Sequence, residues 1–552
     1  MSAIVPVPHA TSRIAFDTIV FWMLLVLLAA IVVVSGPILT SDGPAHLSMA
    51  YFMTRAGDPA WPMLNRLYEL NLSPSPNALG HLIMAGLMLI LPPLVSEQIT
   101  QMLCLLSVPL AARLLLRRVT PKAGWIALFF FPVALQRMFF LGLYNYCLSV
   151  TGCILCIWAY LRLRERTSMA NGATLAALLF ATLACQASGW LEAIVGIGAM
   201  ALADVWSESR TGERTRSLFC LPVAVLASFL PAAVLFGLFA LGGSGDRHIT
   251  YGISALSRVT EILRGDPFAP IGRSTALAAL VVELTLIGLA VSGGIGRWIA
   301  PRQTARRLQM AIWMLPISFL GFALIMPDEA GGGWTHSWRA EPFPYIGLAI
   351  ACAVLPAGRL VRTVAIVVTT AGSLVMMGAM FWVQVRELPP AVREFNEADA
   401  WIGPHCTVAP ILTQFKLDPA NTAQLLYHPL FHLTSRFELR DDRPVLFSYV
   451  ARLPVYPVRF RPGTDPQRLL FGWQPGQRDT RVRQIDIPGY EAASGIPVDY
   501  VLLGDFPEPD QVGPYQDIRA ALARARYKLV HRSSGGRMEL YQRPGPGGCA
   551  KP

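Results

Sequence analysis

The segment TSDGPAH, residues 40–46, places a carboxyl group and an imidazole directly after a long apolar run. Asp42 and His46 are four residues apart, a spacing that puts both side chains on one face of a helix. A carboxylate there could act as a general base that takes a proton from an attacking hydroxyl group, while His46 orients the carboxylate or the attacking group. The alternative interpretation is structural: Asp42 caps a helix whose early position is taken by Pro44, and His46 packs at the interface.

Two arginines are candidates for binding an anionic group. Arg339 lies in the loop PDEAGGGWTHSWRAEPFPY, residues 327–345, and Arg137 precedes the segment GLYNY. A guanidinium group can hold a phosphate through paired hydrogen bonds, so Arg339 is the first candidate and Arg137 the second. Both side chains could instead extend toward phospholipid phosphates.

Three further polar side chains beside apolar runs complete the candidate binding residues. They are His336 in the same loop, Tyr144 in GLYNY, and Glu192 shortly after a turn at Gln186. Polar groups at membrane depth are costly and therefore informative about function. Glu192 could equally bond to neighbouring helices.

The elements that must position these residues are apolar helices. The chain has 552 residues, of which 53% are hydrophobic and only 15% are charged, whereas a soluble domain carries about 25% charged residues. Runs without Asp, Glu, Lys or Arg occur at 18–39, 217–241, 308–326 and 363–383, and each is long enough to cross a hydrocarbon core. The first run is too long for a signal peptide and lacks a good cleavage site, so it is expected to be retained. The sequence therefore predicts an α-helical polytopic membrane protein.

Basic clusters between the apolar runs predict the orientation of the chain, because such clusters mark the cytoplasmic side. They lie at 113–122, 162–166, 210–216, 297–307 and 359–362. If every apolar segment crossed, this rule would put TSDGPAH in the cytoplasm. We interpret the weakest segment, 78–94, as a re-entrant or interfacial helix, because it is short, begins beside His81 and ends at two prolines; a true crossing is the alternative. About eleven transmembrane helices then remain, with the N-terminus in the cytoplasm and residues 40–96 as an external loop.

The composition changes near residue 385. Residues 1–385 are predicted to form the transmembrane domain. Residues 386–552 are rich in Pro and Arg and contain short alternating segments, CTVAPIL, DYVLLGDF and RMELYQR, with a helical stretch, YQDIRAALARARYKLVH, before the last. This pattern predicts a soluble α/β domain, which the topology places on the external, periplasmic side.

Several classes of protein are disfavoured by the sequence. The net charge of +11 does not indicate nucleic-acid binding, because basic residues in a membrane protein mostly mark its cytoplasmic side. The nine cysteines are scattered, so neither a metal site nor a disulfide framework is indicated. No phosphate-binding loop with Lys and Ser or Thr is present, which makes an ATP-driven pump an unlikely assignment.

Together these segments resemble the GT-C superfamily of integral-membrane glycosyltransferases, which includes protein mannosyltransferases and enzymes that transfer aminoarabinose. TSDGPAH occupies the place of the acidic first external loop, QRMFFLGLYNYCLSV resembles the next external turn and span, and HSWRAEPFPYIGLAI is similar to the late loop whose arginine contacts a lipid-linked phosphate. The resemblance covers the architecture of roughly residues 15–385.

The resemblance implies transfer of a sugar from a polyprenyl-phosphate donor to a glycan, lipid or protein acceptor, with inversion, at the external face of a bacterial inner membrane. Asp42 would be the general base and Arg339 would bind the lipid phosphate. The further substrate-binding residues would be Arg137, His46, His336, Glu192 and Tyr144. A lipid-linked saccharide transporter or flippase, or a non-catalytic membrane assembly protein, is the alternative.

The sequence departs from the family pattern at two places that bear on cofactors. Apart from Asp42, the first loop offers only Asp58 and Glu69 before residue 97, where many members carry a pair of acids. The second external turn offers Gln136 and Arg137 instead of an acid. No cofactor is therefore expected, and a divalent metal is possible but without support in the sequence.

Overall fold

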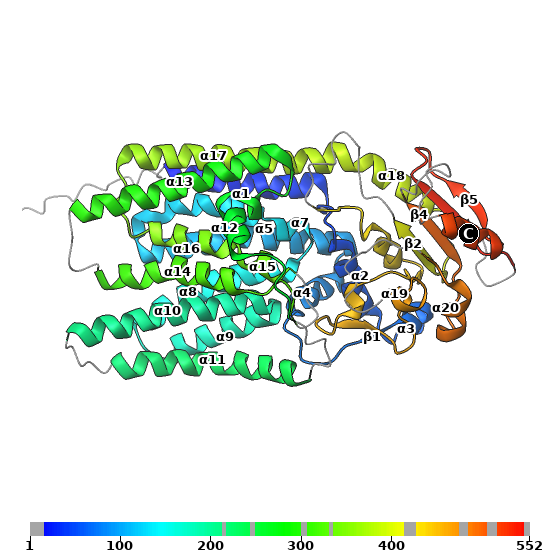
Figure 1. The fold of residues 1–552 in the computed structure, drawn as a ribbon, viewed down its shortest axis with the longest axis horizontal. Helices are drawn as coiled ribbons and strands as arrows, with labels where there is room; N and C mark the ends of the chain where they lie inside the picture. The colour runs from blue at the N-terminus through cyan, green and yellow to red at the C-terminus, as the bar shows by residue number, and fades with distance from the viewer. Residues whose placement is uncertain are drawn as a thin grey trace, which may run out of the picture.

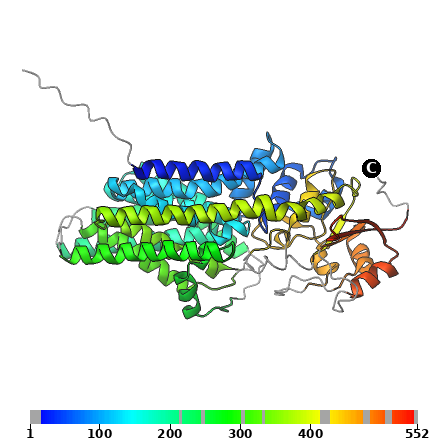
Figure 2. The same ribbon diagram turned by 90° about the horizontal axis from the view of Figure 1, so that it is seen from above.

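A bundle of long helices forms most of the computed structural model (Figures 1 and 2). The structure describes residues 16–211, 217–242, 249–299, 306–330, 335–412, 427–473, 484–504 and 516–545. Within these residues, nine helical segments are long and apolar enough to cross a membrane. They are α1 (Phe16–Ser35), α5 (Pro93–Val119), the run of η1 (Pro121–Phe129), α6 (Phe130–Ala134) and α7 (Arg137–Phe140), α8 (Tyr144–Glu165), α10 (Ala187–Thr211), α11 (Ser217–Gly242), α13 (Gly272–Ile299), α14 (Arg306–Ile325) and α17 (Arg359–Trp382). The chain is therefore a polytopic helical membrane protein, as the sequence predicts.

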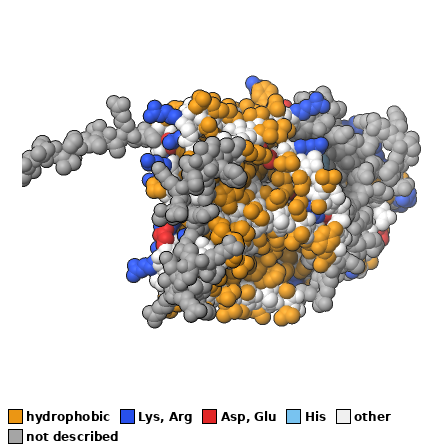
Figure 3. Space-filling view, turned by 60° about the vertical axis from the view of Figure 1, so that its left-hand side comes forward, with side chains coloured by type: hydrophobic (Ala, Val, Ile, Leu, Met, Phe, Trp, Pro, Cys, Tyr) orange, Lys and Arg blue, Asp and Glu red, His pale blue; other side chains and the backbone are white. Residues whose placement is uncertain are grey.

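Large apolar side chains remain exposed on the outside of this bundle. Figure 3 shows hydrophobic side chains spread over the face of the bundle, with Lys and Arg side chains on both sides of this face. Exposed examples are Val26, Val33 and Val34 on α1, Val223, Leu226 and Leu230 on α11, and Val364 and Val367 on α17. An exposed apolar surface of this extent is typical of a membrane-facing surface.

The basic clusters at 113–122, 162–166 and 359–362 gather at one end of the bundle, whereas those at 210–216 and 297–307 lie largely outside the described residues. Ion pairs there join the ends of neighbouring helices: Arg118 of α5 with Glu165 of α8, Arg164 of α8 with Asp204 of α10 at 2.7 Å, and Arg362 of α17 with Asp17 of α1 at 2.7 Å. We call this the basic end. The start of α1 lies there with the basic clusters, as the charge pattern predicts.

Two shorter helices also run between the ends. In α9 (Met169–Cys185), Asn171 donates to the carbonyl of Arg162 at the basic end, whereas Ala184 accepts from the amide of Ala78 at the opposite end. Helix α16 (Pro342–Cys352) follows α15 (His336–Ala340). Just after α16, the carbonyl of Val354 accepts a hydrogen bond from Gln309, near the start of α14, so α16 runs toward that end of α14.

Helix α4 (Leu79–Met88) differs from these, because its ten residues extend only about 15 Å. It packs against α2 (Gly43–Arg55) and the first part of α5 at the end opposite the basic clusters. The chain turns at Leu89–Pro92 and starts α5 at that same end. This arrangement is consistent with a segment 78–94 that turns back; the number of crossings stays a prediction.

The end opposite the basic clusters is built from two distant parts of the chain. After α2 come α3 (Pro62–Leu67) and β1 (Tyr68–Leu70), and β1 pairs antiparallel with β3 (Val458–Phe460). Helix α17 continues through η3 (Val383–Glu387) into α18 (Leu388–Asp399), which leads to the C-terminal elements (Figure 1). The remaining short elements are α12 (Ala255–Leu263), η2 (Asp266–Phe268), η5 (Leu433–Leu439), η6 (Val450–Arg452), α19 (Pro466–Leu469) and α20 (Ile487–Ser494).

The C-terminal elements include a four-stranded mixed sheet of order β2-β4-β6-β5. Its strands are β2 (Val408–Leu412), β4 (Tyr500–Gly504), β5 (Lys528–Arg532) and β6 (Met538–Gln542), with α21 (Gln516–Arg524) between β4 and β5. β2 and β4 are parallel and the other pairs antiparallel. Strands β2, β4 and β6 lie within the three segments that the alternating pattern predicts.

Two sequence predictions in this region need correction. The stretch YQDIRAALARARYKLVH is not one helix: α21 ends at Arg524, Arg526 adopts a positive φ of 59°, and β5 begins at Lys528. Pairing with β6 outweighs the helical propensity of the last residues. In addition, Cys406 is disulfide-bonded, a link that the spacing of scattered cysteines does not predict.

Candidate functional site

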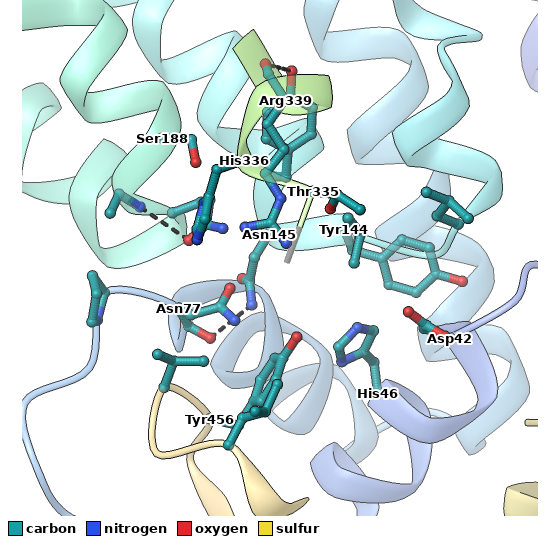
Figure 4. Close-up of a pocket in the computed structure, with 18 of the residues that line it drawn as sticks. Asp42, His46, Asn77, Tyr144, Asn145, Ser188, Thr335, His336, Arg339 and Tyr456 are labelled. Carbon is teal, nitrogen blue, oxygen red and sulfur yellow. Dashed lines mark hydrogen bonds between the residues drawn. The ribbon is translucent and has the colours of Figure 1, made fainter. Parts of the chain in front are cut away.

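A cavity of about 960 Å³ lies where the helical bundle meets the C-terminal elements (Figure 4). Its walls come from α2, α4, the first turns of α8 and α10, the end of α11, α15 and loops of the C-terminal region. Of the candidates chosen from the sequence, Asp42, His46, Tyr144, His336 and Arg339 line this cavity, and Arg137 and Glu192 do not.

Asp42 is held at the edge of the cavity by backbone hydrogen bonds. The amides of Ser41 and Asp42 donate to the carbonyls of Phe140 and Leu141, each at 3.0 Å. This close approach requires Gly142, which has a φ of 85°, because a Cβ there would lie 2.4 Å from the amide nitrogen of Gly43. Asp42 precedes α2 but makes no capping hydrogen bond, so helix capping does not explain the residue.

The surroundings of the Asp42 carboxyl group favour a role as a base near neutral pH. Its Oδ2 accepts a hydrogen bond from the Tyr449 hydroxyl at 2.5 Å, and His432 Nε2 lies 3.9 Å from Oδ1. Burial raises the pKa of Asp42 to about 7, while the Tyr449 hydrogen bond and the charge of Arg339 act in the opposite direction. A base whose pKa matches the working pH combines a useful ionised fraction with proton affinity.

Arg339 brings a positive charge to the same cavity, where it interacts electrostatically with Asp42 without forming an ion pair. Its side chain is buried, its Nε has no hydrogen-bond partner, and no carboxylate of the described residues forms an ion pair with it. The hydroxyl of Tyr146 donates to the Arg339 backbone carbonyl at 2.7 Å and fixes the short helix α15. Figure 4 shows the Arg339 side chain extending toward Asn145. A buried cation without a partner is costly, so an anionic ligand would relieve an existing electrostatic penalty.

His46 belongs to a hydrogen-bonded group of neutral side chains. Its Nδ1 lies 3.0 Å from His81 Nε2, and His81 Nδ1 lies 3.1 Å from Asn145 Nδ2. Burial and the neighbouring His81 and His432 hold the pKa of His46 well below its usual value. His46 is therefore uncharged at neutral pH, unlike Arg339.

Tyr144 connects the cavity wall to the segment that precedes Asp42. Its hydroxyl donates to Glu97 Oε1 at 2.9 Å, accepts from Gln101 Nε2 at 2.7 Å and lies 3.2 Å from Thr40 Oγ1. Gln101 also exchanges hydrogen bonds with the backbone of Ile38, at 2.7 and 2.8 Å. These bonds fix the path of residues 38–42, so Tyr144 positions Asp42 in addition to lining the cavity.

Arg137 and Glu192 lie behind the cavity wall. Arg137 pairs with Glu341 at 2.9 Å, and its guanidinium lies 4.1 Å from the ring centroid of Trp338. Glu192 is buried in α10, where neither carboxyl oxygen has a hydrogen-bond partner, and its neighbour Leu191 lines the cavity instead. We therefore do not carry either residue into the proposed site.

Sequence reasoning missed the contribution of the C-terminal region. Tyr449 and Tyr456 line the cavity from loops about 400 positions after Asp42. The only signal for them is the aromatic content of the segment FSYVARLPVYP, and no spacing rule links this segment to TSDGPAH. Asn145, directly after Tyr144, was missed for a different reason, since its role depends on α4.

The apolar helices and the cavity at one end of the bundle define a polytopic helical membrane protein with a candidate ligand site. Neither a protein-family model nor a curated protein matches the chain. Among the described residues, no group of three or more His, Cys, Asp and Glu side chains is arranged to hold a metal ion. Independence from a metal stays a prediction.

Proposed function

We propose that this protein is a membrane glycosyltransferase that moves a sugar from a polyprenyl-phosphate donor to an acceptor on the external face of the membrane. The observation that carries the proposal is that a candidate general base and a candidate phosphate-binding group line one cavity. A carboxyl group with a pKa of about 7, Asp42, and an unpaired buried guanidinium, Arg339, line the same volume of about 960 Å³.

The reaction needs both groups. The hydroxyl oxygen of the acceptor attacks the anomeric carbon of the donor sugar, and its proton passes to the Asp42 carboxylate. The bond between the anomeric carbon and the phosphate oxygen breaks, and its electron pair leaves with the polyprenyl phosphate. Arg339 stabilises the charge that grows on this leaving group. A single displacement of this kind inverts the anomeric configuration.

The apolar part of the cavity suits the lipid portion of such a donor. Uncharged residues from α10, from α11 and from the segments that follow α11 and α14 line it: Leu191, Phe236, Phe239, Ala240, Ile249 and Met326. The helix α11 also carries exposed apolar side chains. An isoprenoid chain could therefore enter from the hydrocarbon layer while its phosphate meets Arg339.

The proposal includes an orientation in the membrane. If α9 and α16 cross together with the nine longer segments, the chain crosses about eleven times, with the N-terminus in the cytoplasm and the cavity outside. Residues 386–552 would then be an external soluble α/β domain at a bacterial inner membrane. The disulfide of Cys406 supports this side, because disulfides persist in oxidising compartments.

A transporter of lipid-linked saccharides is a less suitable interpretation. A transport path needs polar groups from one end of the bundle to the other. The described lining residues instead lie at the end opposite the basic clusters.

The experiment is transfer by purified protein supplied with a panel of polyprenyl-phosphate sugars and acceptors, measured as release of polyprenyl phosphate. Asp42→Asn should lower the rate at least about 100-fold, because a general base contributes that much or more. Asp58→Asn is the matched control, since Asp58 lies in the same segment but outside the cavity. Equal rates for the wild type and Asp42→Asn would remove Asp42 as the base, and no release with any donor would reject the function.

A further inference from the structure

Three side chains of the cavity wall, those of Asn145, His81 and His46, form a hydrogen-bonded relay. Asn145 of α8 is fixed by two bonds: the amide of Gly80 donates to its Oδ1 at 2.6 Å, and its Nδ2 donates to the carbonyl of Asn77 at 2.8 Å. The second hydrogen of the same Nδ2 faces His81 Nδ1 at 3.1 Å, and His81 Nε2 faces His46 Nδ1 at 3.0 Å.

These contacts determine where the histidine protons lie. An amide nitrogen only donates, so His81 Nδ1 accepts, and the proton of neutral His81 is on Nε2. This Nε2–H donates to His46 Nδ1, which leaves the proton of His46 on its own Nε2. In the other tautomer, His81 Nδ1–H would donate to the Asn77 carbonyl. Two N–H donors, those of His81 Nδ1 and Asn145 Nδ2, would then face each other at 3.1 Å, which is unfavourable.

The second ring nitrogen of His46, Nε2, takes no part in the relay. This nitrogen has no hydrogen-bond partner among the described residues. The ring lies 5.4 Å from the ring of Tyr456 and 6.2 Å from that of Tyr144, measured between centroids. Figure 4 shows His46 between Asp42 and Tyr456. A group held between the base and the phosphate-binding arginine would meet this N–H.

The charged residues that line the cavity restrict the chemistry of the ligand group that meets His46 Nε2–H. Asp42 is the only carboxylate and Arg339 the only guanidinium or ammonium group among the described lining residues. If Asp42 takes the acceptor proton, no second carboxylate of these residues is left for a cationic substituent. His46 Nε2–H needs a lone pair, which a hydroxyl oxygen has and an ammonium group lacks.

We propose that His81 and Asn145 hold His46 as its neutral Nε2–H tautomer, and that this N–H donates to a hydroxyl oxygen of the transferred sugar. The site then takes a neutral, hydroxyl-bearing sugar and rejects one that carries an ammonium group at that position. His46 is a specificity-determining binding residue, and His81 and Asn145 are positioning residues. The ligand assignment rests on the proposed function, whereas the tautomer does not.

The tautomer is tested by nitrogen NMR of ¹⁵N-histidine-labelled full-length protein without ligand, with the His46 signals identified by their loss in His46→Gln. We expect a neutral ring protonated at Nε2 near pH 7. A proton on Nδ1 overturns the relay whatever the protein does. In Asn145→Leu both tautomers of His46 should appear, and an unchanged signal in that folded variant would remove Asn145 as the positioning residue.

The sugar preference is tested with donors that share one polyprenyl chain and differ at single sugar positions, where hydroxyl is replaced by hydrogen or by an amino group. At one sugar position we expect kcat/KM to be about 10-fold lower for the deoxy substrate than for the hydroxyl substrate, the usual range for one hydrogen bond. The substrate with an ammonium group at that position should have a lower kcat/KM still. His46→Gln, which keeps a hydrogen-bond donor, should retain the ratio of kcat/KM between the hydroxyl and deoxy substrates. His46→Phe should lose this preference. His531→Phe, in β5 far from the cavity, is the matched control.

Two outcomes would overturn the proposed contact between His46 and a sugar hydroxyl group. The first is a hydroxyl-to-deoxy ratio in His46→Phe equal to that of the wild type. The second is equal use of hydroxyl and ammonium donors at every position. Absence of transfer by the wild type from every donor would reject the proposed function and the sugar assignment with it, while the NMR result would still decide the relay.

Discussion

Among the described residues, the hydroxyl of Tyr449 is the one side chain that favours the ionised form of Asp42 by hydrogen bonding. With a pKa of about 7, Asp42 is about one-tenth ionised at pH 6 and about one-hundredth at pH 5. If the carboxylate is the base, the transfer rate falls about tenfold per pH unit below 7 and levels off above it.

Removal of the Tyr449 hydroxyl should move this pH profile. In Tyr449→Phe the carboxylate loses a donor, so the apparent pKa should rise by about one unit, the equivalent of one hydrogen bond to a charged group. The rate would fall at pH 7 and recover by pH 9, as measured by kcat against pH. Tyr251→Phe, at an exposed tyrosine, should keep the wild-type profile, and an unshifted profile in Tyr449→Phe would contradict the role of this hydrogen bond.

The raised pKa of Asp42 also has a consequence for stability. The folded-state pKa of about 7 exceeds the ordinary value of 3.8, so the folded protein binds this proton more tightly than the unfolded chain. The corresponding stabilisation is complete below about pH 4 and is lost as the pH rises through 7. Asp42→Asn, which cannot ionise, should therefore unfold at a higher temperature than the wild type at pH 8, with a smaller difference at pH 5. A lower unfolding temperature for Asp42→Asn at pH 8 would show that the buried charge is better compensated than these contacts indicate.

At the scale of elements, the site depends on the contact between residues 41–43 and 140–142. Gly142→Ala places a methyl group 2.4 Å from the Gly43 amide nitrogen and in a strained conformation at a φ of 85°. Because the amide bonds of Ser41 and Asp42 pass through this contact, Asp42 should shift, and the transfer rate should fall at least tenfold.

Gly378→Ala in α17 is the matched control for this substitution. A Cβ at Gly378 meets nothing within 4 Å, and alanine in a helix gains up to about 1 kcal/mol over glycine. This variant should be fully active and at least as stable as the wild type. Full activity of Gly142→Ala would show that the loop adjusts without moving Asp42.

The elements differ in how far the sequence predicts them. Apolar length alone predicts α1, α11, α14 and α17, because no other environment accepts about 20 uncharged residues. It does not predict that β5 follows α21 directly, since the strand depends on pairing with β6. The same limit applies to the site: TSDGPAH is visible from composition, whereas Tyr449 reaches Asp42 only after the C-terminal elements fold onto α2.

At the scale of the whole molecule, two independent features bear on its orientation. The described basic clusters, at 113–122, 162–166 and 359–362, and the start of α1 lie at one end of the bundle, and the cavity and the C-terminal sheet lie at the other. Among the described residues, the seven free cysteines all lie in the bundle, whereas disulfide-bonded Cys406 belongs to the C-terminal elements. Charge and redox state therefore favour the same side for the cavity.

Reporter fusions provide the test of this orientation. Fusions after Ala60 and Val95, which flank α4, should both report the external side, because the chain turns at Leu89–Pro92 and starts α5 at the same end as α4. A fusion after Arg166, between α8 and α9 at the basic end, should report the cytoplasm and serves as the control. Opposite reports from Ala60 and Val95 would mean that 78–94 crosses. Cytoplasmic reports from both would put Asp42 on the wrong side of the membrane for the proposed reaction, because the acceptor could not reach the carboxylate from outside.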